Sequence, residues 1–186
     1  MKTLEEQLQA AGLTVFGCCE RLSVAGADLL QTSPLLQDMT PAEADILGAS
    51  MLLVRAEPGQ VLIREGEAGD WMLLLLKGTV DVTKRLEPRD GATPADPKTE
   101  VVSSRVAVIQ RGASLGEMSM LDSEPRYASC TAIEAVEAGV LGRHEIALLI
   151  RDHPGVGAKL LVKITQLMAQ RLRNTSNHLV RLLQKK

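Results

Sequence analysis

A run of short apolar segments between Met51 and Lys84, separated by turn residues, is the feature of the sequence that most constrains the fold. Four strands are predicted in it, at residues 51–56, 60–64, 71–76 and 79–84. The third, from Trp71 to Leu76, is continuously apolar, which is typical of a buried strand. Pro58-Gly59, the glycine-rich turn at 65–70 and Gly78 divide the run. Short strands at this spacing predict a compact β-roll or barrel.

The stretch from Ser114 to Ala132 carries the chemistry that the sequence offers. Gly116 and Glu117 open a short apolar turn, and Arg126 follows Glu117 by nine residues. A carboxylate can accept a hydrogen bond from a sugar hydroxyl, and the planar guanidinium group matches phosphate oxygens. Backbone N–H groups at the start of a helical turn also favour an anion. We therefore expect a ligand with a hydroxyl at one end and an anion at the other.

These two regions resemble cyclic nucleotide-binding domains. Residues 115–129 are similar to the phosphate-binding cassette of that family, with the Gly-Glu pair followed by Pro125-Arg126. The glycines of the 51–84 run are similar to the glycine skeleton of its β-roll, and the resemblance covers about residues 33 to 183. It implies an α+β fold: a jelly-roll-like cyclic nucleotide-binding β-roll, flanked by N-terminal helices and a long C-terminal dimerisation helix.

The chain is accordingly divided into three predicted segments. They are an N-terminal helical extension at 1–32, the β-roll at 33–142, and a hinge with a long helix at 143–186. Helices are expected at 1–12, from Ser33-Pro34, from Thr40 to Ala49, at 143–152, and from about 157 to 183. Residues 85–105 are expected to form a long hairpin loop, 106–110 a strand, and 128–133 with 136–141 a closing pair of strands.

The long helix carries a heptad seam, which is typical of helix pairing. The seam consists of Leu161, Thr165, Met168, Leu172, Thr175, Leu179 and Leu182. Two interpretations stay open: a parallel homodimer through this helix, or a single amphipathic helix folded onto its own body. A second apolar line, Leu160, Ile164 and Leu167, could pack on the roll.

The segment around Thr175 and Ser176 resembles the dimer helix of the catabolite activator family. That resemblance implies that Thr175 and Ser176 hydrogen-bond the base of the nucleotide, with the serine reaching in from the partner subunit. In an ordinary coiled coil, polar seam residues would only fix the register of the pair. The preference for cAMP over cGMP rests on these two residues, and cGMP stays an alternative ligand.

The resemblance also assigns the ribose and phosphate contacts. They fall on Gly116, Glu117, Met118, Arg126, Tyr127 and Ala128, with Glu117 on the ribose 2′-hydroxyl and Arg126 with nearby amides on the cyclic phosphate. The family usually has a small residue where this chain has Tyr127. The ring could point away, donate its hydroxyl to the phosphate, stack on the ligand, or fill the pocket and abolish binding.

The implied function is a cyclic nucleotide receptor that signals to a partner protein by helix rearrangement near residues 143–157. The alternatives are a degenerate β-roll used for assembly, and a sensor of another nucleotide. We expect no enzymatic activity, catalytic cofactor or metal site, because His144, His153 and His178 are scattered and lack a partnered nucleophile. The effector protein is unknown.

Charge and composition set the remaining expectations. Residues 154–186 carry +7 and no acidic residue, whereas the whole chain carries −2. This basic segment is either a solvated helix face or a surface for an acidic partner, an anionic lipid or a nucleic acid. Three cysteines, two of them adjacent, form no disulfide framework and favour the cytoplasm. We expect no transmembrane segment and no helix-turn-helix DNA-binding domain in this chain.

Overall fold

The fold was determined as a computed structural model that describes residues 3–19, 21–25, 28–86 and 102–184. The chain forms two compact units, each discontinuous in sequence. The first contains residues 1–17 and 52–143, and the second contains residues 18–51 and 144–186. The three predicted segments, which are continuous, stay a prediction.

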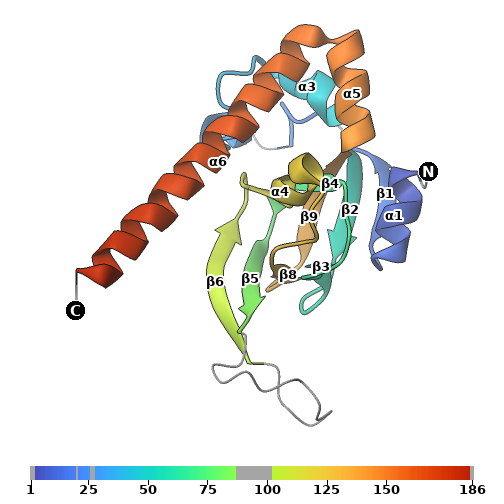
Figure 1. The fold of residues 1–186 in the computed structure, drawn as a ribbon. Helices are drawn as coiled ribbons and strands as arrows, with labels where there is room; N and C mark the ends of the chain where they lie inside the picture. Colours follow the sequence, from blue (N-terminus) through green and yellow to red (C-terminus); the bar gives the residue numbers. More distant parts are fainter. Residues whose placement is uncertain (1–2, 20, 26–27, 87–101, 185–186) are drawn as a thin grey trace. The chain divides into compact units, whose positions relative to one another are not determined.

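The first unit is the predicted β-roll, built from two antiparallel sheets (Figure 1). The five-stranded sheet has the order β1-β2-β9-β4-β7, formed by Thr14–Cys18, Leu52–Ala56, Val136–Gly142, Trp71–Lys77 and Ser114–Leu115. The four-stranded sheet has the order β3-β8-β5-β6, formed by Val61–Ile63, Ser129–Ala132, Thr79–Arg85 and Ser103–Gln110. The α+β class and the β-roll are therefore confirmed.

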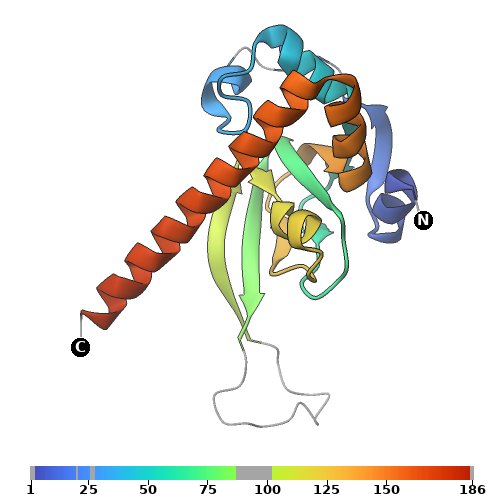
Figure 2. The ribbon, with the colours of Figure 1, turned by 45° about the horizontal axis from the view of Figure 1, so that its top comes forward.

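A largely aliphatic core lies in this unit. Strands β4 and β9 pair from Trp71 opposite Gly142 to Lys77 opposite Glu137, and their central residues are fully buried. Leu4 and Leu8 of helix α1 (Leu4–Ala10) join the same core, which places the predicted N-terminal helix in the first unit. Strands β5 and β6 lie side by side in both ribbon views (Figure 1 and Figure 2).

The second unit is helical in its described residues. It contains α2 (Leu29–Thr32), α3 (Pro41–Ala49), α5 (Arg143–Asp152, whose first residue closes the first unit) and α6 (Pro154–Leu183). The predicted start of α3 is confirmed: Thr40 and Glu43 form a reciprocal capping box, and the helix ends at Ala49. Helix α3 contacts α6. Lys159 of α6 donates to both carboxylate oxygens of Glu43, at 2.7 and 2.8 Å.

Three predictions of local structure were wrong. Ser33-Pro34 does not start a helix, because Ser33 ends α2 and its carbonyl accepts the N–H of Leu36 in a turn that reverses at Asp38 (φ 72°). Residues 14–18, for which no element was predicted, form edge strand β1. The predicted hairpin loop ends earlier than residue 105, because β6 begins at Ser103; its residues 87–101 lie outside the described residues.

The third error concerns the predicted closing pair of strands. Strand β8 pairs with β3 and β5, whereas β9 pairs with β2 and β4, so the two strands belong to different sheets. Alternation of apolar residues identifies a strand but not its partner, so it could not show that these consecutive strands lie in different sheets. In the part of the chain that the structure describes, no helix has the length and apolar character that crossing a membrane requires.

Candidate functional site

The cassette, residues 115–129, contains a short helix that begins after a glycine. No other residue could replace this glycine without strain. Helix α4 (Glu117–Asp122) follows β7, and its N-cap, Gly116, has φ 81°. A Cβ atom at Gly116 would lie 3.0 Å from Ile63 Cδ1 and 3.2 Å from the carbonyl oxygen of Trp71. Positive φ and close packing together therefore require glycine here.

Arg126 is folded into the interior of the first unit. Its side chain is only 4% exposed, and its Nη1 atom donates to the carbonyl oxygen of Gly116 at 2.8 Å. The guanidinium group stacks on the ring of Trp71, with 4.2 Å between its Cζ atom and the ring centroid. Its Nη2 atom is buried and has no hydrogen-bond partner among the residues that the structure describes. One strong donor of a buried cation is thus left for a ligand to satisfy.

The backbone around Arg126 is fixed to the turn between β3 and β4. The N–H of Arg126 donates to the carbonyl oxygen of Glu67 at 2.8 Å, and its own carbonyl accepts the N–H of Gly66 at 2.9 Å. Gly69, in the same turn, packs directly against the guanidinium group: a Cβ atom there would lie 2.5 Å from Nη2. The turn therefore determines where this side chain can lie.

Burial sets the electrostatics of Arg126. Removal from water lowers the pKa of Arg126 to about 10, although Cys130, Asp70 and Glu67 favour its charged form. Neither Asp70 nor Glu67 forms an ion pair with it. Arg126 is still charged at neutral pH, so the site contains a buried cation without a counter-ion among the described residues. An anion bound here would offset the cost of that burial.

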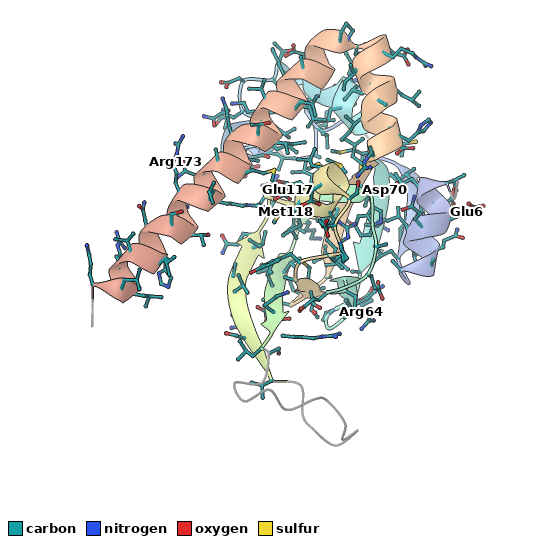
Figure 3. The ribbon with its side chains drawn as sticks, viewed as in Figure 1. Glu6, Arg64, Asp70, Glu117, Met118 and Arg173 are labelled. Atoms are coloured by element: carbon teal, nitrogen blue, oxygen red, sulfur yellow. The ribbon has the colours of Figure 1, made fainter. Side chains whose placement is uncertain are left out.

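The other predicted ligand residues differ in their exposure to solvent. Glu117, at the first position of α4, is 1% exposed, whereas Met118 is on the surface (Figure 3). Tyr127 is 58% exposed, so its ring does not fill a buried pocket. Ala128 is partly buried beside it. The structure brings Gly116 and Arg126 into direct contact and leaves Met118 and Tyr127 at the surface.

Lys84 of β5 contacts Tyr127, the residue after Arg126, and no local sequence pattern predicted this role. Its Nζ atom donates to the carbonyl oxygen of Tyr127 at 2.7 Å and to Glu65 at 2.8 Å. The same atom lies 4.4 Å from the centroid of the Tyr127 ring, in a cation–π contact. Trp71, Gly69 and Lys84 are therefore site residues that local pattern could not reveal, because each depends on pairing between distant segments.

Thr175 and Ser176 lie on α6, in the second unit. Both are exposed, and the Thr175 hydroxyl donates to the carbonyl oxygen of Arg171 at 3.0 Å. Such a bond to the preceding turn is common for helical threonine. Their assignment to the base of a ligand stays a prediction.

A β-roll with a glycine-capped cassette helix and a buried arginine defines a class of ligand-sensing domain, and comparison with known proteins gives the family. The family model described as the cyclic nucleotide-binding domain matches residues 53–153, and the chain belongs to that family. A solved cyclic nucleotide-binding domain from Methylobacillus flagellatus is 28% identical, with a TM-score of 0.76 over 97% of this chain and 94% of its own. The catabolite activator protein of Thermus thermophilus is 26% identical, with a TM-score of 0.67 over 81% of this chain and 63% of its own.

Two curated relatives extend the comparison. The CRP-like cAMP-activated global transcriptional regulator of Mycobacterium tuberculosis is 26% identical over 84% of this chain. A cAMP-dependent protein kinase regulatory subunit of Yarrowia lipolytica is 32% identical over 61% of this chain. The alignments span 62% of the first relative and 26% of the second, so only part of each is matched.

Proposed function

We propose that this protein is a cyclic nucleotide receptor, with cAMP as its ligand, and not an enzyme. The observation that carries the proposal is the buried Arg126 guanidinium, which is held at the cassette glycine and keeps an unpartnered Nη2 donor. In this proposal Arg126 and the amides of the cassette bind the cyclic phosphate. Glu117 accepts from the ribose hydroxyl, and Gly116, Met118, Tyr127 and Ala128 line the ligand.

The choice of cAMP is supported by the relatives, two of which are named for cAMP. The prediction that Thr175 and Ser176 contact the base is part of the same proposal. Substituting both with alanine should reduce the preference for cAMP over cGMP more than it reduces total affinity, since only the base contacts distinguish the two ligands.

We also propose that the active form is a homodimer that signals to a partner protein in the cytoplasm. The support comes from the C-terminal part of α6, residues 172–183, which we call its outer half. There Leu172, Leu179 and Leu182 are between 54% and 68% exposed. These leucines belong to the predicted heptad seam, and a second copy of the helix would cover them.

A second function is favoured by one observation. Nη1 of Arg126 donates to the carbonyl oxygen of Gly116, and the guanidinium group stacks on Trp71. Contacts within the protein therefore already stabilise part of this guanidinium group. A module that keeps this packing for stability, and assembles without a nucleotide, would show the same contacts.

Calorimetric titration with cAMP and then cGMP separates the two functions, with sedimentation to give the oligomeric state. A receptor binds one cAMP per chain; Arg126→Ala abolishes binding, whereas Arg151→Ala, an equal change of charge at an exposed site, does not. A folded protein that releases heat with neither ligand supports the assembly module. Because the Tyr127 ring is exposed, Tyr127→Ala should not restore binding to such a module.

A further inference from the structure

A cavity of about 560 Å³ lies in the first unit, away from most of the predicted nucleotide contacts. Its walls come from α1, from β3 with the following turn, and from α4. Of the residues predicted to bind the nucleotide, Arg126 is the one that lines it; Glu117, Met118 and Tyr127 do not. The volume is within the range of sites for small molecules. Figure 3 shows Asp70 beside α4 on the side of α1, and Arg64 at the end of β3.

Within the described part of the chain, two buried polar atoms of residues that line this cavity have no hydrogen-bond partner. They are Nη2 of Arg126 and Oδ1 of Asp70, and both residues line the cavity. Buried polar atoms in a native fold are nearly always hydrogen-bonded, so an orphaned donor and an orphaned acceptor in one cavity indicate a missing group. The donor would bind an anionic oxygen, and the acceptor would bind a hydroxyl or amine hydrogen.

A second guanidinium group adds positive charge to the cavity. Arg143 lines it and is positioned by three hydrogen bonds. Its Nε donates to the carbonyl oxygen of Met120 at 2.8 Å, and its Nη2 donates to the same oxygen and to the Ser123 hydroxyl at 3.0 Å. None of these bonds neutralises its charge. Arg64 and Glu67 also line the cavity, but they pair with each other at 3.2 Å. Two cations, Arg126 and Arg143, therefore face one carboxylate, that of Asp70.

Apart from the polar Gln7, Ser119 and Ser123, much of the remaining wall is apolar. It includes Ala10, Ala11, Leu62 and Trp71. The cavity thus combines a cationic end, one acceptor and a short apolar surface. This combination matches a small organic molecule with an oxyanion and a hydroxyl group.

We propose that this cavity is a second ligand site, which binds a small hydroxylated oxyanion, a phosphate or a carboxylate, between Arg126 and Arg143. A further consequence rests on the proposed cAMP function: because both ligands use the Arg126 guanidinium, each weakens the binding of the other. Such coupling is reciprocal by thermodynamic necessity. The site would let a second small molecule set the sensitivity of the receptor.

The test is a titration with inorganic phosphate and, separately, with malate, a hydroxylated carboxylate. Ala10→Glu places a negative charge on the exposed wall residue of α1, while Gln9→Glu places the same charge on the neighbouring exposed residue, which does not line the cavity. Wild type should bind at one site per chain, and Ala10→Glu should bind about tenfold more weakly because of like-charge repulsion. Gln9→Glu should equal wild type. The more tightly bound probe identifies the class of anion.

Three outcomes would overturn the proposal: no saturable binding of either probe in the millimolar range, equal binding by wild type and Ala10→Glu, or equal loss in both variants. Thermal melting of each variant establishes that the fold is retained. Titration with cAMP is run in parallel. If cAMP fails to bind while the effect of Ala10→Glu on phosphate or malate persists, the receptor function fails and the second site stands. If cAMP binds while neither phosphate nor malate does, the second site fails and the receptor function stands.

Discussion

The cassette and the outer half of α6 differ from the usual distribution of residues, polar outside and apolar inside, in opposite ways. The cassette buries polar side chains, among them Glu117, Ser119 and Arg126, each less than 5% exposed. The outer half of α6 exposes leucines, among them Leu172, Leu179 and Leu182. Charged residues are seldom fully buried, and large contiguous apolar surfaces are seldom left open to water. In the proposed function a bound anion would offset the first feature, and an apolar partner would cover the second.

The two deficits differ in energy and in what removes them. A shift of the Arg126 pKa from 12.5 to about 10 corresponds to a cost on the order of 3 kcal/mol for the buried charge. Each exposed leucine forgoes about 1.5–3 kcal/mol that its burial would contribute. A small anion can offset the first cost, while a second helix is needed to recover the other.

The largest effect is expected from Arg126→Met, which removes the buried charge and keeps an unbranched side chain. Affinity for cAMP should fall by roughly a hundredfold or more, because a buried phosphate would lose its cation. The melting temperature of the ligand-free protein should stay equal or rise, since replacing a buried charge by an apolar group is often neutral or stabilising. Calorimetry and thermal melting measure the two effects. A variant that melted several degrees lower and still bound cAMP would make Arg126 a structural residue.

The matching change on α6 is Leu172→Lys together with Leu179→Lys. It should convert the proposed dimer to a monomer, because two charges on each helix would face their copies across the seam. The melting of the single chain should change little, since both side chains are already exposed. Sedimentation equilibrium gives the result. Asn177→Lys, an exposed position outside the seam, is the control; equal dissociation by the control would point to charge alone, and a dimeric double variant would place the interface elsewhere.

A smaller effect is expected from Gly69→Ala. The added Cβ atom would lie within 2.5 to 2.7 Å of three guanidinium atoms of Arg126, so that the flexible end of the side chain must move. We expect the fold to persist and cAMP affinity to fall by about tenfold, because the group is displaced from its position at Gly116. Gly155→Ala, where nothing lies within 4 Å, is the matched control. Unchanged affinity in Gly69→Ala would mean that the observed position of the guanidinium is not the one used for binding.

Most strands of the roll could be predicted from the sequence, because each strand is an apolar run bounded by turn residues. Apolar runs and turn glycines gave β4 and β5 to within a residue, and a threonine, proline and glutamate gave α3. Pairing was not predictable in the same way: β8 and β9 are consecutive in sequence and lie in different sheets. Partner choice depends on long-range packing, which a period of two residues does not encode.

The site divides along the same line. Gly116, Glu117 and Arg126 could be chosen from one stretch, because their spacing and the resemblance are local. Three other contacts involve segments far apart in sequence. Arg126 stacks on Trp71 and packs on Gly69, and Lys84 donates a hydrogen bond to the carbonyl oxygen of Tyr127. Only the folded chain shows that the arginine is buried and which atom is left without a partner.

The smallest effect concerns the inner part of α6, which, unlike the outer half, is held within its own unit by polar contacts. Hydrogen bonds from Lys159 and then from the N–H of Thr40 lower the pKa of Glu43 to about 2. A carboxyl group with a depressed folded pKa stabilises the fold at pH values above its unfolded pKa, and this contribution is lost as pH falls toward 2. Glu43→Gln should therefore melt slightly lower than wild type at neutral pH, and the difference should shrink between about pH 5 and pH 2. Thermal melting across that range measures it; a difference that is constant with pH would assign the effect to the amide in the α3 cap and not to the charge.

Since Lys159 and Glu43 are partly exposed, added salt should reduce the same difference in melting temperature. Salt would not weaken an apolar association of the outer half in this way, so the two kinds of contact can be distinguished.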